Sequence, residues 1–187
     1  MNMTRRALLG ATAVALPVAL AGCGIVTSTT VNGVTTVTVN VAKLDAYAKA
    51  VQNGTDALLA NPLIAGAMGA GVAVAVAAAL TGAADAISAI DKQANGSQTL
   101  TFSATNVPAA LTSLQSNATT IYDDVQTAFT TVAAKLPATV AQAFSALETV
   151  VALLLAVMPT VAVAKAALKG MPVPRMPEAR ALAILHA

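Results

Sequence analysis

The strongest constraint on how this chain folds is the helical spacing of apolar residues in its middle part. Between residues 107 and 132, apolar side chains recur at alternating steps of four and three residues, with polar residues between them. This spacing puts them on one face of an α-helix, and an apolar face of this length has to be buried. The stripe consists of Val107, Leu111, Leu114, Ala118, Ile121, Val125, Ala128 and Val132.

Two further stripes are also built from steps of four and three residues and predict two more long helices. The first consists of Ile64, Met68, Val72, Val76, Leu80, Ala83, Ile87 and Ile90. The second consists of Val140, Phe144, Leu147, Val151, Leu154, Met158 and Val161. A shorter helix is expected from Val41 to Val51. Four helices in hairpin order predict an all-α fold, an antiparallel four-helix bundle.

Residues that begin and end helices lie at the edges of these stripes. Asn61 before Pro62 fits an N-cap with proline in the first turn. Asn106 is expected to cap the third helix, and Pro137 to start the fourth. Glycines follow the periodic segments where a left-handed residue commonly ends a helix, at Gly54, Gly96 and Gly170.

The segment before the first helix is rich in Thr and Val and has room for a small β-hairpin or a short strand pair. Asn32-Gly33 is a strong signal for a two-residue hairpin turn. A flexible tether is the alternative for the first residues of this segment. A second short strand is expected from Gln98 to Ser103, where Leu100 and Phe102 share one face, and the two regions are able to pair.

Two apolar runs raise the question of membrane insertion. Leu63 to Ala84 is 22 residues long and has no charge, and as a helix of about 33 Å it matches a hydrocarbon core of about 30 Å. Its many Ala and Gly residues contribute little to insertion, so we expect a soluble core helix, with a spanning helix as the alternative. Thr149 to Ala164 is expected to be a central bundle helix, kinked or broken at Pro159.

Residues 171–187 form a proline-rich tail in which Glu178 to His186 is compatible with a short helix. At the other end, residues 1–22 have the three parts of a secretory signal: the basic pair Arg5 and Arg6, an apolar run, and small residues before a cleavage site.

The last residues of this signal, Leu20, Ala21, Gly22 and Cys23, resemble the lipobox of bacterial lipoproteins. In that class the cysteine thiol is linked to a diacylglycerol, and the signal is cleaved just before the cysteine. The chain has a single Cys, and it lies at the required position. The resemblance implies a covalent lipid on Cys23 and anchoring to a membrane, since several acyl chains hold stably where one holds only marginally.

Export and sorting follow from the same resemblance. Arg5-Arg6 also resembles a twin-arginine export motif, although Gly10 departs from that pattern, so both export routes stay open. Gly24, in place of Asp after the cysteine, implies the outer membrane if the host is Gram-negative. The mature protein is expected in the cell envelope, facing the periplasm or the exterior. We expect residues 23–40 to form the tether or hairpin and residues 41–170 the helical bundle.

The sequence offers little for catalysis or metal binding. The chain has one His, His186 next to the C-terminus, which we interpret as a solvated residue, and Cys23 is committed to lipid. Asp123 and Asp124 are adjacent and point about 100° apart on a helix, which suits a solvated surface. Asp45 and Lys49 form an i,i+4 pair that supports a helix. We expect no metal and no cofactor other than the lipid.

Charge argues against nucleic-acid binding. Without Arg5 and Arg6, the 10 Lys and Arg residues fall to 8, equal to the 8 Asp and Glu residues. A neutral domain with 3% aromatic residues has neither the basic surface nor the stacking groups that nucleic acids need.

These features together predict a non-enzymatic, lipid-anchored envelope lipoprotein, which serves as a structural module or binds an unidentified envelope protein. Two alternatives remain. One is a membrane-active protein whose two apolar helices insert and form a pore. The other is a carrier that holds an apolar ligand between helices rich in Ala and Gly.

Overall fold

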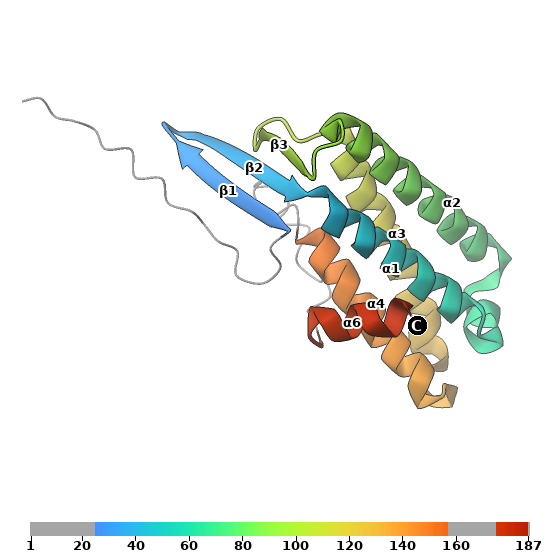
Figure 1. The fold of residues 1–187 in the computed structure, drawn as a ribbon. Coiled ribbons are helices and arrows are strands. Elements are labelled where there is room, and N and C mark those ends of the chain that lie inside the picture. Colours follow the sequence, from blue (N-terminus) through green and yellow to red (C-terminus); the bar gives the residue numbers. More distant parts are fainter. Residues whose placement is uncertain (1–24, 157–174, 187) are drawn as a thin grey trace, which may run out of the picture.

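The structure is a computed structural model that describes residues 25–156 and 175–186. For residue 186 it describes the backbone alone. Its elements are, in order, β1 (Val26–Val31), β2 (Val34–Asn40), α1 (Val41–Leu59), α2 (Pro62–Ala94), β3 (Thr99–Ser103), α3 (Ala109–Val132), a 3-10 turn (Ala133–Lys135), α4 (Ala138–Leu155) and α6 (Glu178–His186). The expected predominance of helix is confirmed. A small sheet extends to one side of the helices (Figure 1).

The expected hairpin is confirmed, and a third strand completes an antiparallel sheet in the order β1-β2-β3. Asn32 and Gly33 form the turn with φ values of 51° and 78°, the left-handed pair that a type I′ turn requires. Val37 of β2 pairs with Phe102 of β3, and Val39 pairs with Leu100. The alternative of a tether is therefore wrong for residues 26–40, and the fold is not purely α.

Helix α1 begins directly where β2 ends. Asn40 caps it, because its side-chain oxygen accepts a hydrogen bond of 2.9 Å from the backbone N–H of Lys43. The helix continues to Leu59 and does not stop near Val51 as expected. Gly54, predicted to lie past its end, is buried within it. An added Cβ there would lie 2.8 Å from Cδ2 of Leu185 in α6, so this glycine permits close approach of two helices.

Helix α2 runs back alongside α1 (Figure 1). The predicted cap is confirmed: the Asn61 side chain accepts a hydrogen bond of 3.0 Å from the N–H of Leu63, and Pro62 is in the first turn. Gly69 interrupts the helix with φ 72° and ψ 162°, a conformation that only glycine adopts readily. The helix ends at Ala94, where Asn95 and Gly96 are left-handed, as expected for this end.

Helices α3 and α4 begin at prolines. Pro108 precedes α3 and Pro137 precedes α4, the second as expected. Asn106 does not cap α3, because the chain turns at that residue and its backbone N–H donates to the carbonyl of Ser103 at 2.9 Å. The predicted stripe of α3 is confirmed: Leu111, Leu114, Ala118, Ile121, Val125 and Ala128 are all buried.

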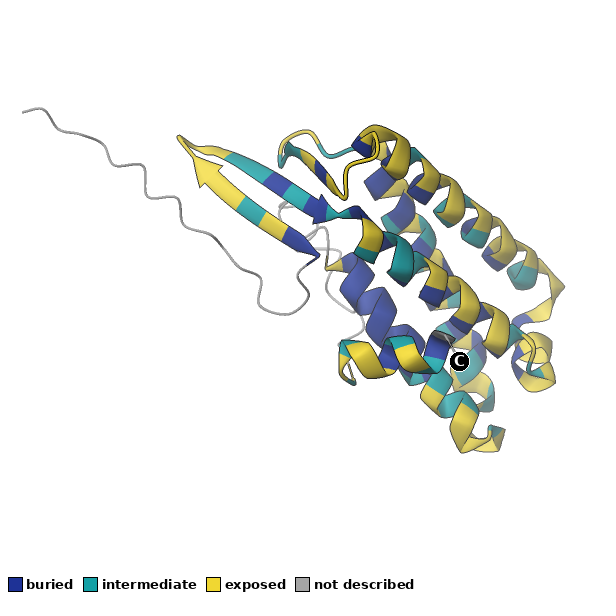
Figure 2. Cartoon of the chain, in the orientation of Figure 1, coloured by how far each residue is buried: buried dark blue, intermediate teal, exposed yellow. Residues whose placement is uncertain are grey.

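Helix α4 is the most enclosed element in the described part of the chain. Every residue from Ala146 to Leu155 is buried, and α1, α3 and α6 pack against it. Figure 2 shows the contrast between this helix and α2, which is exposed along much of its length. The expectation of a central helix therefore holds up to residue 155. Pro159 and Gly170 lie outside the described residues.

The short helix expected from Glu178 to His186 is present as α6, and it docks on α1 and α4. Ala181 and Leu185 face the core. An ion pair of 3.9 Å between Lys43 Nζ and Glu178 Oε1 also joins α1 to α6. The side chain of His186 lies outside the described part.

The close contact at Gly54 generates a stability prediction. The substitution Gly54→Leu inserts a side chain where Leu185 already packs, so we expect a loss of about 1 to 3 kcal/mol in the free energy of unfolding. Urea unfolding of the full chain, followed by far-ultraviolet circular dichroism, measures it.

The matched control is Gly71→Leu, since nothing lies within 4 Å of a Cβ at Gly71. It should leave the stability unchanged or raise it by up to about 1 kcal/mol, because leucine favours a helix over glycine. Equal stabilities of the two variants would show that the α1–α6 contact is not tight.

Candidate functional site

The residues that the sequence marks for processing lie outside the described part of the chain. Arg5 and Arg6, together with the residues that resemble a lipobox, Leu20, Ala21, Gly22 and Cys23, all fall within residues 1–24. The described fold begins with Ile25, whose carbonyl accepts a hydrogen bond of 2.7 Å from the backbone N–H of Asn40. Two residues after Cys23, the chain is thus already part of the folded domain.

Within the described residues, the most unusual group is the carboxylate of Glu148. Glu148 is the single charged residue of α4, and its side chain is only 2% exposed. Its Oε1 accepts a hydrogen bond of 3.1 Å from the hydroxyl of Tyr122 on α3. Its Oε2 lies 2.9 Å from Nε of Arg175, a contact that pairs the charges without hydrogen-bond geometry.

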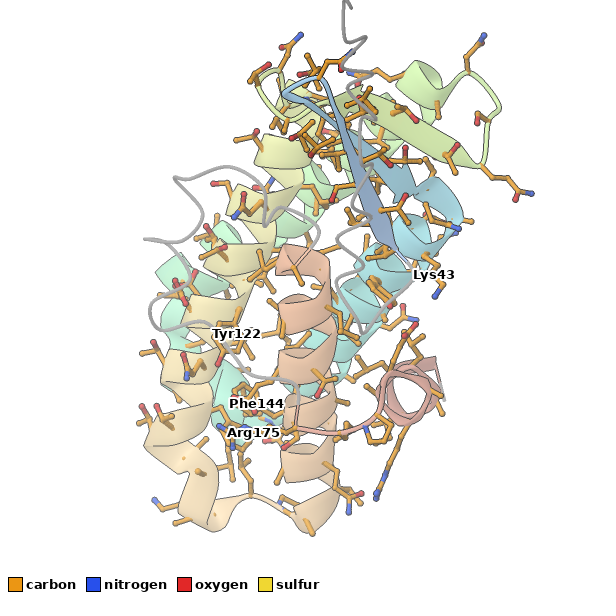
Figure 3. The ribbon with its side chains drawn as sticks, turned by 90° about the vertical axis from the view of Figure 1, so that its left-hand side faces the viewer. Lys43, Tyr122, Phe144 and Arg175 are labelled. Carbon is orange, nitrogen blue, oxygen red and sulfur yellow. The ribbon has the colours of Figure 1, made fainter. Side chains whose placement is uncertain are left out.

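Arg175 is held at this place by its backbone as well as by its side chain. Its N–H donates to the hydroxyl oxygen of Thr149 at 3.2 Å, and that hydroxyl donates to the carbonyl of Ser145 at 2.9 Å. Arg175 lies three residues before Glu178, the first residue of α6. Its contacts with Glu148 and Thr149 therefore hold the chain just before α6 against α4, and Figure 3 shows Arg175 beside this helix.

Aromatic rings complete the surroundings of this carboxylate. Phe144 stacks on Phe129 with ring centres 4.0 Å apart, and on Tyr122 at 6.4 Å. Three of the five aromatic residues of the chain thus meet here. Stacked pairs of this kind contribute about 0.5 to 1.5 kcal/mol beyond their buried area.

The environment of Tyr122 changes its acidity. Burial, followed by the charge of Glu148 and the hydrogen bond to it, raises the pKa of Tyr122 from 10.0 to about 12. The phenol therefore stays protonated and donates to Glu148 throughout the neutral range. A protonated phenol that donates to a paired carboxylate is suited to holding helices together.

The amino-acid sequence does not predict this cluster, although it contains one signal of it. Glu148 interrupts an otherwise uncharged stretch from Ala138 to Ala156, and a charge within a buried helix needs a partner. The partners of Glu148 could not be predicted from the sequence, because Tyr122 and Arg175 each lie 26 or more positions from Glu148 along the chain.

The other expected surface features are where they were placed. Asp45 and Lys49 form the i,i+4 pair, with Nζ and Oδ2 2.8 Å apart. Asp123 and Asp124 lie at the surface, and partial burial together with the charge of Asp124 raises the pKa of Asp123. Among the described residues, no group of His, Cys, Asp or Glu side chains is arranged to hold a metal ion.

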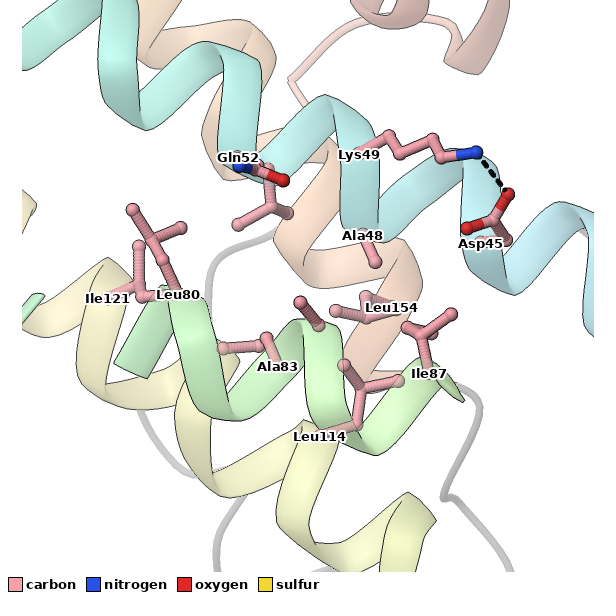
Figure 4. Close-up of a pocket in the computed structure, with 13 residues that line it drawn as sticks. Asp45, Ala48, Lys49, Gln52, Leu80, Ala83, Ile87, Leu114, Ile121 and Leu154 are labelled. Carbon is pink, nitrogen blue, oxygen red and sulfur yellow. Dashed lines mark hydrogen bonds and ion pairs between the residues drawn. The ribbon is translucent and has the colours of Figure 1, made fainter. Parts of the chain in front are cut away.

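A cavity of about 130 Å³ lies between the helices, away from Glu148. Figure 4 shows it below α1, with side chains from α2, α3 and α4 forming its other walls. Its polar residues, Asp45, Lys49 and Gln52, are all on α1. Every other lining residue is apolar, and among them Ala48, Ala83, Ala84 and Ala118 are small.

Two helices of the described part are long and apolar enough to cross a membrane, α2 and α4. The core helix of a soluble protein can have the same length and composition, so burial has to distinguish a core helix from a spanning helix. The most apolar 18-residue stretch of α4 is 61% buried, whereas that of α2 is 22% buried. Helix α4 is therefore a core helix, and α2 presents an apolar surface that the described residues leave uncovered.

Comparison with protein-family models, with curated proteins and with solved structures finds no match to this chain.

The raised pKa of Tyr122 generates a prediction of pH dependence. A group whose pKa is raised on folding stabilises the fold fully below its unfolded pKa, and this contribution is lost as the pH rises through the folded pKa. Folding raises the pKa of Tyr122 from 10.0 to about 12. The free energy of unfolding should therefore fall by up to about 2 to 3 kcal/mol as the pH rises from 10.0 to about 12.

Urea unfolding of the full chain at several pH values tests this expectation. Tyr122→Phe should remove that part of the loss, whereas Tyr47→Phe, which keeps the phenol of Tyr122, should retain it. If Tyr122→Phe and the unmodified chain lose the same stability between pH 10 and 12, the hydroxyl of Tyr122 is not the titrating group.

Proposed function

We propose that this chain is a lipid-anchored lipoprotein of the bacterial cell envelope, whose helical domain binds a partner protein and performs no catalysis. The lipobox resemblance at Leu20 to Cys23 supports the anchor, and we propose that a covalent lipid on Cys23 is its only cofactor. The domain faces the periplasm or the exterior, on the outer membrane if the host is Gram-negative. In this proposal α1 to α4 act as an antiparallel four-helix bundle that displays the binding surface.

The observation that carries the proposal is the outer face of α2. This surface is exposed, uncharged and apolar, and its largest side chain, Val74, is 69% exposed. It consists of Ala70, Gly71, Val74, Ala75, Ala77 and Ala78, which follow the interruption at Gly69. Uncovered apolar surface of this extent is typical of an interaction site.

The small size of these side chains favours a helix as the partner element. Ala and Gly let two helix backbones approach closely, and the energy then comes from packing along the whole length of contact. They add little to membrane insertion, where Leu, Ile and Phe contribute most. The outer face of α2 therefore suits an apolar helix of a neighbouring envelope protein better than it suits lipid.

A second candidate function is membrane insertion. The length and low burial of α2 favour it, since α2 could leave the other helices at smaller cost than α4. Departure of α4 would expose ten consecutive buried residues and would separate Glu148 from Tyr122. A pore that needs both apolar helices would therefore have to dismantle the core.

The anchor is tested by lipid incorporation. Cells that express the full chain and receive a labelled fatty acid should yield labelled protein, because the thiol of Cys23 receives the diacylglycerol. Cys23→Ser should yield none, and Ser28→Ala, a change in the exposed hairpin region, should be labelled like the unmodified chain. Label in Cys23→Ser, or its absence from the unmodified chain, would contradict the anchor.

The partner surface is tested by site-specific photo-crosslinking in the same cells. A photoreactive residue at Val74 should join the full chain to one protein of discrete mass, whereas the same residue at Thr112, exposed on α3, should not. Ala78→Asp, one turn from Val74, should lower the yield at least about tenfold, because a charge in an apolar helix interface costs more than 1.4 kcal/mol. Thr120→Asp on α3 is its matched control.

The outcomes separate the two candidates. Crosslinking of Val74 to lipid alone, together with dye release from vesicles that contain the full chain, would favour membrane insertion. If neither Ala78→Asp nor Thr120→Asp changes the yield of the crosslinked protein, the outer face of α2 is not the binding surface.

A further inference from the structure

The cavity between α1 and α2 is a second feature that the proposed function does not use. It has one polar side and several apolar sides. Asp45, Lys49 and Gln52 of α1 provide the polar side, and Lys49 and Gln52 are exposed, so they mark its mouth. Leu80, Leu114 and Leu154 come from three other helices and form apolar walls (Figure 4).

The cavity exists because alanines stand where the helices face one another. Ala48 on α1 lies across from Ala83 on α2, and Ala118 on α3 adds a third small side chain to the lining. Larger residues on either side of them hold the helices apart. A water molecule needs two to four polar partners, and the apolar walls offer none, since helix backbone groups are bonded to one another.

We propose that this cavity binds a small linear amphiphile, with a short alkyl tail among the leucines and an uncharged polar head beside Asp45, Lys49 and Gln52. The volume sets the length of the tail. An apolar cavity of about 150 Å³ holds one benzene molecule, and this cavity has about 130 Å³. A tail of about six carbons fits, whereas the long tail of a membrane phospholipid does not.

Asp45, Lys49 and Gln52 form the rim of the cavity. The chemistry of this rim selects the head group of the ligand. Asp45 and Lys49 are paired at 2.8 Å, so their opposite charges offset one another and this side of the cavity carries no net charge to attract a charged ligand. The amide of Gln52 both donates and accepts hydrogen bonds. An alcohol or a primary amide therefore suits the rim better than a carboxylate or an amine.

Photolabelling of the full chain in phospholipid nanodiscs tests the proposal. The probe is a six-carbon primary alcohol that carries a diazirine in its tail, and peptide mass spectrometry locates the label. The label should lie on cavity residues, Leu80, Ile87 and Leu114 among them. Label distributed over the outer face of α2 would overturn the site.

Competition with unlabelled alcohols tests the tail. At equal free concentration, 1-hexanol should compete about 15-fold better than 1-butanol, because each of two further buried methylenes increases affinity about fourfold. The affinity should stop rising with chain length once the tail fills the cavity, so 1-decanol should compete only slightly better than 1-octanol. A steady gain through 1-decanol would indicate partition into lipid and would overturn the proposal.

Hexanoate and hexylamine test the head. Both should compete less well than 1-hexanol, and a clear preference for either charged compound would overturn the assignment of the rim. A phosphatidylcholine with a diazirine in its tail tests whether the ligand is instead a bilayer lipid. This probe should leave the cavity residues unlabelled. Labelling of Leu114 by it would show that a bilayer lipid enters the cavity and would contradict the proposal.

Substitutions on two facing walls give an independent test. Ala83→Leu and Ala48→Leu fill the cavity and should lower labelling of Leu114 at least about tenfold, since bulk replaces the ligand. Ala57→Leu, the same change at an exposed position of α1, should leave it unchanged. Equal labelling in all three variants would contradict the proposal. Circular dichroism shows whether each variant folds, and where one does not, the competition series on the unmodified chain decides.

Discussion

The rest of the structure depends on one constraint, the need to cover α4 on all sides. Ten consecutive residues of this helix are buried, so one neighbouring helix is not enough. Helices α1 and α3 pack on two of its sides and α6 on another. Gly54 lets α6 come close to α1, and the carboxylate of Glu148 gives α3 and the start of α6 a common polar partner. The buried charge thus ties together segments that are distant in the sequence.

A buried carboxylate is costly unless its charge and hydrogen bonds are matched. Here the hydroxyl of Tyr122 donates a hydrogen bond to one oxygen, and Arg175 balances the charge beside the other, while Arg175 keeps much of its own side chain in water. This arrangement lowers the cost of burying Glu148 and helps to position α6, because Arg175 contacts both Glu148 and Thr149. The cluster is a structural device, and it lies apart from both surfaces that we connect with function.

The two functional proposals share a physical origin in the small side chains of α2. On its outer side, Ala and Gly residues leave an apolar surface with little relief, suited to close contact with another helix. On its inner side, Ala83 and Ala84 leave space that the leucines of α3 and α4 do not fill, and a cavity remains. A helix with larger side chains at these positions would close the cavity and would present a different outer surface.

Local sequence determined the elements whose signals are local. The Asn32-Gly33 turn, the Asn61 cap, the stripe of α3 and the terminal helix from Glu178 are decided by neighbouring residues, and the structure has them where they were expected. The resemblance of residues 20–23 to a lipobox likewise uses only adjacent residues, and it stays a prediction. The role of Gly54 and the partners of Glu148 were decided by tertiary structure, because packing against Leu185, Tyr122 and Arg175 joins residues that are far apart in the chain. The buried side of α2 was predicted by its stripe from Ile64 to Ile90, which is buried or half-buried. That no described helix covers the opposite, equally apolar side was decided only by tertiary structure, because it depends on where the other helices lie.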